Sequence, residues 1–141
     1  MADFPREKIE ALEKAVGLNP GDARAWANLG WCYGELGNHQ QAVEALQKAI
    51  DLDPSPEIAW SNLGTAYGHL GEHQQAVEAW QKAVELDPSK AWTWNKLGES
   101  YAYLGEHERA TEAYRKALSL TDDPDLTRRV KEYLKQLGAA Q

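Results

Sequence analysis

The chain has 141 residues, a formal net charge of −7 and a single cysteine, Cys32. This length suits one domain with its own core, and the negative charge argues against nucleic acid or an anionic membrane as the main partner. One cysteine excludes a disulfide framework or a cysteine-built zinc site within one chain, and we interpret Cys32 as a small buried residue rather than a reactive thiol. No apolar run approaches the roughly 20 residues that span a bilayer, and residues 1–5 lack the features of a signal peptide. We therefore expect a cytoplasmic protein.

The first predicted element is a helix over residues 5–20. Ile9, Leu12, Ala15 and Val16 fall on one helical face. The segment ends in a Leu-Asn-Pro sequence that is similar to the Leu-Asp-Pro endings of two later helices. We interpret it as the second helix of a repeat whose first helix is missing.

Three units of 34 residues follow without insertion or deletion, at residues 23–56, 57–90 and 91–124. Self-similarity at a fixed period of this length is typical of a stacked repeat array. The shared residues are Trp26, Trp60 and Trp94; Leu29, Leu63 and Leu97; Gly30, Gly64 and Gly98; Tyr33, Tyr67 and Tyr101; Gly37, Gly71 and Gly105; His39, His73 and His107; Ala42, Ala76 and Ala110; and Ala49, Ala83 and Ala117.

Each unit is predicted to form two helices. In the second unit, apolar residues from Trp60 to Leu70 are spaced three and four apart, and Gly71 then supplies a left-handed end to the helix. A glycine inside this helix, Gly64, should cost about 1 kcal/mol relative to alanine. Because all three units keep that glycine, we expect a tight helix crossing there.

A second apolar stripe in the same unit runs from Ala76 to Leu86. It stops at Asp87-Pro88, because proline disfavours helical geometry in the residue before it. After the third unit, residues 124–137 place Leu126 and four other apolar residues on one stripe and charged residues elsewhere, as a terminal capping helix does. These are Leu126, Val130, Tyr133, Leu134 and Leu137. We therefore predict an all-α, single-domain protein over residues 1–141, with eight helices and no strands.

The pattern resembles the tetratricopeptide repeat family. The motif W-x2-L-G-x2-Y, with later alanines and a proline, is present from Trp26 to Pro54 and from Trp60 to Pro88. The third unit departs at its end, where Asp122 replaces the proline and Pro124 follows two residues later. The resemblance implies a right-handed superhelical solenoid whose first helices line a concave groove, and it implies noncatalytic peptide or protein binding. Family members act in chaperone adaptors and assembly scaffolds, among other roles, and fold analogy does not choose among these.

The resemblance also implies which side chains face the groove, namely those at six places of each first helix. Unlike the shared core positions, these places differ from unit to unit, as a recognition surface requires. The peptide-binding residues predicted in this way are Arg24, Asn28, Trp31, Glu35, Asn62, Thr65, His69, Trp92, Asn95, Lys96, Glu99 and Tyr103.

Asn28 and Asn62 lie one repeat apart, and an asparagine amide can donate to and accept from the backbone of an extended peptide. Alternatively, they only tie local structure together. Lys96 takes this place in the third unit and suits a carboxylate. A full clamp for a C-terminal carboxylate is not expected, because only Asn62 and Lys96 match that arrangement, whereas Trp31 and Trp92 stand where it needs polar or basic groups.

Trp31 and Trp92 lie outside the repeating core, and large aromatic residues on a concave face are typical interface anchors. The alternative is that they pack between neighbouring first helices. Gly34 and Gly68 favour binding, because a missing side chain lets a ligand approach. Arg24, Lys96, Glu35 and Glu99 are expected to set the charge register of the bound segment.

His39, His73 and His107 recur with the repeat, but neighbouring repeats lie about 10 Å apart, too far for a shared metal ion. We expect them to stack between turns, and we predict no metal and no cofactor. The sequence holds no Ser/His/Asp arrangement and no phosphate loop, so we predict no enzyme activity. We predict a monomeric binding module; the alternatives are a self-associating scaffold, an idealised or engineered array, and a piece of a longer array.

Overall fold

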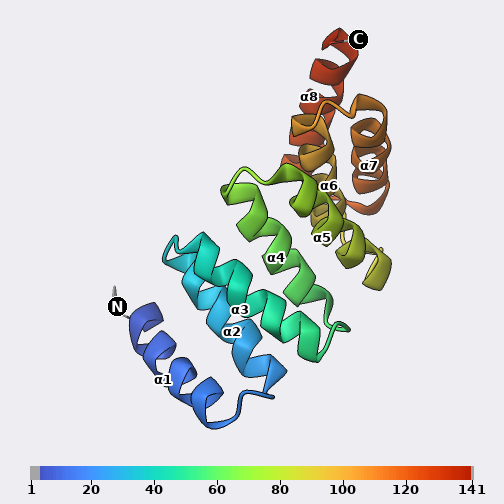
Figure 1. Cartoon of the computed structure of the whole chain (residues 1–141). Coiled ribbons are helices and arrows are strands. Elements are labelled where there is room, and N and C mark those ends of the chain that lie inside the picture. The colour runs from blue at the N-terminus through green and yellow to red at the C-terminus, as the bar shows by residue number, and fades with distance from the viewer. Residues whose placement is uncertain (1–3, 141) are drawn as a thin grey trace. The chain divides into compact units, whose positions relative to one another are not determined.

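The computed structural model describes residues 4–140 and is helical throughout its regular parts (Figure 1). Within these residues there are eight helices and no strand, so the predicted all-α class is confirmed. The predicted domain limits at residues 1 and 141 lie outside the described residues. The helices are α1 (Phe4–Leu18), α2 (Ala23–Glu35), α3 (His39–Leu52), α4 (Glu57–His69), α5 (His73–Leu86), α6 (Ala91–Tyr103), α7 (His107–Leu120) and α8 (Pro124–Ala140).

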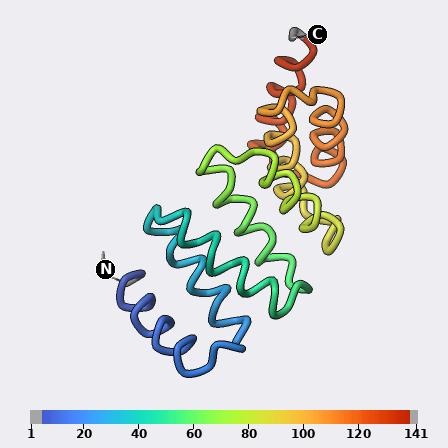
Figure 2. Tube along the Cα trace, viewed as in Figure 1, coloured from blue at the N-terminus to red at the C-terminus, as the bar shows by residue number. Residues whose placement is uncertain are grey.

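The helices form two compact units, a first unit (Met1–Glu72) and a second unit (His73–Gln141), which are larger than the 34-residue repeats. In the first unit α1, α2, α3 and α4 pack in chain order, and α2 also contacts α4; in the second, α6 contacts α5, α7 and α8. Within each unit, Figure 2 shows the short turns that reverse the chain between consecutive helices. The boundary between the units falls between α4 and α5, inside the predicted repeat at residues 57–90, and the single domain stays a prediction.

Each first helix ends at a glycine in the left-handed region, as predicted for Gly71. The φ angles are +81° at Gly37, +75° at Gly71 and +76° at Gly105. The next backbone N–H then donates back to a tyrosine carbonyl, for example from Glu72 to Tyr67 at 2.9 Å. These bonds satisfy carbonyls that the helix end leaves open, and they start the turn into the second helix.

The shared glycine inside the first helix lies at a close crossing. A Cβ atom at Gly30 would stand 2.6 Å from Leu46 Cγ, and one at Gly98 would stand 2.7 Å from the ring of Tyr114. Both distances are too short for a real Cβ contact. The predicted tight crossing of first and second helix is therefore confirmed at Gly30 and Gly98.

Each of the three shared tryptophans forms a hydrogen bond near the start of its first helix. The indole N–H of Trp26 donates to the carbonyl of Pro20 at 2.9 Å. Trp60 and Trp94 repeat this bond to Pro54 and Pro88, each at 2.8 Å. A single hydrogen bond thus joins the end of one second helix to the beginning of the next first helix.

The N-terminal helix α1 packs against α2 as a second helix should. Ile9 and Val16 are buried in one core with Leu29 and Cys32, whose thiol is fully buried. Burial raises the pKa of the Cys32 thiol. This environment fits the interpretation of Cys32 as a small core residue.

The connection from α7 to α8 differs from the earlier ones, as the missing proline predicts. After α3 and α5, Asp53 and Asp87 accept hydrogen bonds from the backbone N–H and hydroxyl of Ser55 and Ser89. After α7, Thr121 instead accepts from the N–H of Asp123. Asp123 then accepts from Asp125 at the start of α8, which continues to Ala140 rather than ending at residue 137.

Candidate functional site

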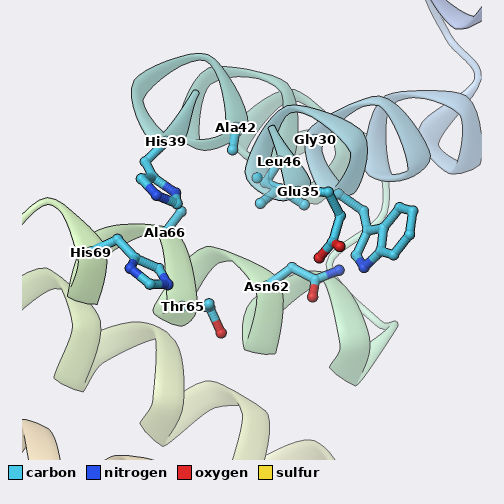
Figure 3. Close-up of a pocket in the computed structure, with 11 residues that line it drawn as sticks. Gly30, Glu35, His39, Ala42, Leu46, Asn62, Thr65, Ala66 and His69 are labelled. Carbon is cyan, nitrogen blue, oxygen red and sulfur yellow. The ribbon is translucent and has the colours of Figure 1, made fainter. Parts of the chain in front are cut away.

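A pocket of about 120 Å³ opens in the first unit between α2, α3 and α4 (Figure 3). Helix α2 supplies Glu35 from its last residue, and α4 supplies polar side chains from the face turned toward α2. The lining residues are Gly30, Trp31, Gly34, Glu35, His39, Ala42, Leu46, Asn62, Thr65, Ala66 and His69.

Five of the residues predicted to bind a peptide meet at this pocket: Trp31, Glu35, Asn62, Thr65 and His69. They come from different helices, so the fold brings together side chains that are far apart in the sequence. Arg24 and Asn28 are exposed on α2 but do not line the pocket. Predicted pairing of Asn28 and Asn62 on one ligand backbone stays a prediction.

The inner wall of the pocket is made of small residues and one leucine. Gly30 lies against Leu46, with Ala42 and Ala66 beside them. Gly34 has no heavy atom within 4 Å of where its Cβ would stand, so the space above it is open. The absence of side chains on this wall is what creates the pocket.

Two stacked imidazoles close one end of the pocket. The ring centroids of His39 and His69 are 4.3 Å apart, with an interplanar angle of 7° (Figure 3). Burial, and next the neighbouring His69, lower the pKa of His39. The predicted stacking of the repeated histidines is thus observed at His39, and again at His73, which stacks on Tyr103 with centroids 4.3 Å apart.

In the second unit the predicted residues lie along α6. Lys96 pairs with Glu99 at 3.2 Å, and its ammonium also lies 5.6 Å from the centroid of the Trp92 ring. Trp92 meets Trp80 edge to face, with centroids 5.4 Å apart. Trp80 lies on the second helix α5, so this contact is not the predicted alternative of packing between first helices, and 46% of Trp92 stays exposed.

A second pocket, of about 300 Å³, lies between α6, α7 and α8. It occupies the same place in its unit as the first pocket does in the other, between a first helix, its second helix and the following helix. Glu99 and Tyr103 line it together with Ala102, Tyr114, Tyr133 and Gln136. Burial raises the pKa of both Tyr114 and Tyr133.

Asn95 corrects the prediction for one residue. Its side chain is only 2% exposed, and its amide N–H lies 3.5 Å from the Glu99 carboxylate. The position of Asn95 in the repeat faces the interior of the protein. Ser61, which occupies the same position one repeat earlier, is likewise only 3% exposed. Asn95 therefore does not present its amide on this surface.

Sequence reasoning missed His39 and two residues of α8, Tyr133 and Gln136, as pocket residues. His39 was assigned to the repeating framework, although it also lines a pocket. Tyr133 and Gln136 lie 34 residues after Glu99 and Ala102, so treating α8 as the first helix of a fourth unit would have found both.

Within residues 4–140 no group of three or more metal-ligating side chains comes together. No helix in that range combines the length and apolar character needed to cross a membrane. What the described surface offers is a set of exposed aromatic rings and polar side chains beside small-residue pockets.

Repeated helix-turn-helix units with a conserved core and a varied first-helix face define a helical repeat protein of the protein-interaction class. The family-level comparison specifies this further: tetratricopeptide repeat profiles match residues 23–56 and residues 56–123. The chain belongs to the tetratricopeptide repeat family, which is generally noncatalytic. No individual curated protein matches the sequence.

Solved structures share the fold over most of the chain. A crystal structure of MamA is 29% identical, has a TM-score of 0.79, and the match covers 92% of this chain and 84% of that one. The first TPR of Spaghetti (RPAP3), bound to the HSP90 peptide SRMEEVD, is 23% identical with a TM-score of 0.76, over 84% of this chain and 91% of that one. At its level of identity the second match concerns the fold alone.

Proposed function

We propose that this protein is a noncatalytic module that binds a segment of another protein along the exposed faces of its first helices. The observation that carries this proposal is the contrast between two sets of positions. Residues shared by the repeats, such as Leu29 and Leu63, are buried, whereas the aromatic residues of the first helices that vary between repeats are exposed. Trp31 is 44% exposed, Trp92 46% and Tyr103 73%.

Exposed aromatic side chains on a rigid helix are suited to protein recognition. They lose little conformational freedom on binding and bury a large apolar area, which is why tryptophan and tyrosine dominate interface hot spots. Helix packing fixes their backbones before a partner arrives, so little ordering entropy opposes binding. Micromolar affinity then needs only about −8 kcal/mol.

The polar residues would orient the bound segment. Asn28 and Asn62 are able to pair with its main chain, and Arg24, Glu35, Lys96 and Glu99 would select its charges. The Spaghetti structure, which holds a peptide, supports the idea that this fold can present such a surface. We also propose a cytoplasmic location and a monomer that binds no nucleic acid.

The test compares the affinity of a partner, recovered from the source cytosol and purified, for wild-type protein and for the double variant Trp31→Ala and Trp92→Ala. We expect a loss of about 2 kcal/mol or more, roughly 30-fold. The control is Leu52→Ala, which removes a similarly exposed side chain (47%) from the end of α3. Equal affinity of the double variant and the wild type would refute the assignment.

Self-association is the second candidate, because a second copy could cover the same exposed aromatic rings. Sedimentation velocity at several protein concentrations distinguishes the two. A sedimentation coefficient that rises with concentration, and no longer does so in the double variant, would favour a self-associating scaffold. A coefficient independent of concentration would exclude it.

A further inference from the structure

The first-unit pocket is too small for a whole metabolite and is suited to one side chain. Its volume of about 120 Å³ compares with roughly 300–1,000 Å³ for pockets that enclose drug-sized molecules. The size of the pocket is therefore that of a single side chain.

The polar atoms that reach this pocket are mostly hydrogen-bond acceptors. Glu35 contributes a carboxylate, which accepts only, and the Asn62 amide can either donate or accept. The hydroxyl of Thr65 donates its proton to the carbonyl of Ser61 at 3.0 Å, so it faces the pocket as an acceptor. Figure 3 shows the side chains of Glu35 and Asn62 pointing toward one another between α2 and α4.

The charge of the pocket is negative and uncompensated by its own lining. None of the lining residues is a lysine or an arginine. Among the described residues no ion pair engages Glu35, whereas Glu99, the carboxylate that lines the second-unit pocket, is already paired with Lys96. The place of Glu35 is taken by Tyr103 in the third repeat. A ligand cation would gain a partner at Glu35 that a cation at Glu99 would have to share.

The aromatic rim favours a cation as well. The ammonium of Lys8 lies 5.9 Å from the centroid of the Trp31 ring, so this indole already attracts a positive group within the unit. Indole faces attract cations because the ring carries negative charge on its face. A carboxylate and an aromatic ring face both attract the positive end of a lysine or arginine side chain.

From these observations we propose that the pocket between α2, α3 and α4 receives a lysine or arginine side chain of the partner segment, held by Glu35 together with Asn62 and Thr65. The inference rests on the proposed function for the existence of a partner segment. It adds the chemistry of one residue in that segment. It also predicts that the two units differ, since only the first offers an unpaired carboxylate in its pocket.

The test uses small probes, so that it does not depend on knowing the partner. N-acetyl-arginine amide, N-acetyl-lysine amide and uncharged N-acetyl-norleucine amide are titrated separately into isotope-labelled protein and followed by NMR. We expect the basic probes to bind about threefold to fivefold more tightly than norleucine, the range for a partly exposed ion pair. The shifts should concentrate on the Asn62 amide and on the rings of His39 and His69.

Glu35→Gln should bring the affinities of the basic and uncharged probes together, while Glu44→Gln should leave the preference unchanged. Glu44 is an exposed glutamate of α3 that does not line the pocket, so the second variant removes the same charge from the same unit. Added salt should weaken the preference in the wild type and not in Glu35→Gln.

Equal binding of charged and uncharged probes to the wild type would overturn the proposal, and so would a preference that survives in Glu35→Gln. Neither result bears on the proposed function, which stands or falls with the Trp31 and Trp92 double variant. Conversely, a cation preference that depends on Glu35 supports the pocket even if the double variant binds its partner normally.

Discussion

Gly30 and Gly34 lie one helical turn apart on α2, in opposite surroundings. A Cβ at Gly30 would collide with Leu46, whereas the space around Gly34 is open. Gly30→Ala should lower the free energy of unfolding by about 1–2 kcal/mol, because overpacking costs more than the gain in helix propensity. Gly34→Ala should raise it by about 0.5–1 kcal/mol. Urea unfolding followed by circular dichroism measures both, and a stabilised Gly30→Ala would contradict the close crossing.

Gly34→Ala should also separate stability from binding. Its methyl group would stand in the pocket, so we expect partner affinity to fall by about 1 kcal/mol although the fold is more stable. Gly17→Ala, on α1, is the matched control, since Gly17 also has open space around it but lies away from the pocket. Unchanged affinity in Gly34→Ala would show that the bound segment does not approach this wall.

His39 should make the stability of the first unit depend on pH. Its pKa in the folded protein lies below the ordinary value of 6.5, because burial and the adjacent His69 disfavour the charged ring. The unfolded chain therefore binds more protons in this range, and the free energy of unfolding rises with pH. The stabilisation is fully present above 6.5 and is lost as the pH falls through 6.5 toward the lower folded value.

Urea unfolding at about pH 7.5 and about pH 5.5 tests this dependence. His39→Gln should lose less stability between the two conditions than the wild type does. His73→Gln is the comparison, because His73 stacks on an uncharged tyrosine ring instead of a second imidazole. If both variants changed the pH dependence equally, the stacked imidazole pair would not be its source.

At the scale of helices, the bond from each shared tryptophan to a proline carbonyl explains why both residues recur. Trp60→Phe keeps an aromatic ring at the start of α4 but removes the N–H that donates to Pro54. We expect a loss of about 1–2 kcal/mol in the free energy of unfolding, from one hydrogen bond and some packing.

Trp31→Phe provides the control for this change, since the exposed Trp31 indole makes no hydrogen bond to the described part of the chain. Its effect on the free energy of unfolding should stay within about 0.5 kcal/mol, as for other surface substitutions. Equal losses in the two variants would assign the cost to ring size rather than to the hydrogen bond.

The helices could be predicted from the sequence because each depends on local signals. Glycine at positive φ ended the first helices at Gly37, Gly71 and Gly105, and apolar spacing indicated the buried face. The hydrogen bonds from tryptophan to proline could not be predicted in this way. They depend on how the chain curves between two helices. The spacing of residues along one helix carries no information about that curve.

The candidate site was predictable only in part, for the same reason. Family resemblance indicated the first-helix face and thus Trp31, Glu35 and Asn62, but it placed Asn95 on that face too. The inward position of Asn95 follows from the angle at which α6 packs against its neighbours, a property of the assembled unit. His39 was predicted to stack, yet its ring partner on α4 and its place in the pocket emerge only from the packing of three helices.

For the whole molecule, repeat architecture implies that stability is distributed along the chain. Each helix in a repeat array contacts mainly its neighbours, so the ends can open without unfolding everything. Helix α1 packs against α2 through buried residues such as Ile9 and Val16, which share one core with the fully buried Cys32. The thiol of Cys32 therefore reports whether α1 is in place.

Ile9→Ala should loosen α1 and accelerate reaction of Cys32 with a thiol reagent in native buffer. Truncating a buried isoleucine costs about 2–5 kcal/mol, and the opening should expose a thiol that burial otherwise keeps protonated and unreactive. Val130→Ala, a truncation of a fully buried residue in α8, is the control. Because the opening free energy of α1 should depend on its own contacts, Val130→Ala should leave the labelling rate close to that of the wild type. Equal acceleration in both variants would instead mean that the chain opens as one cooperative unit.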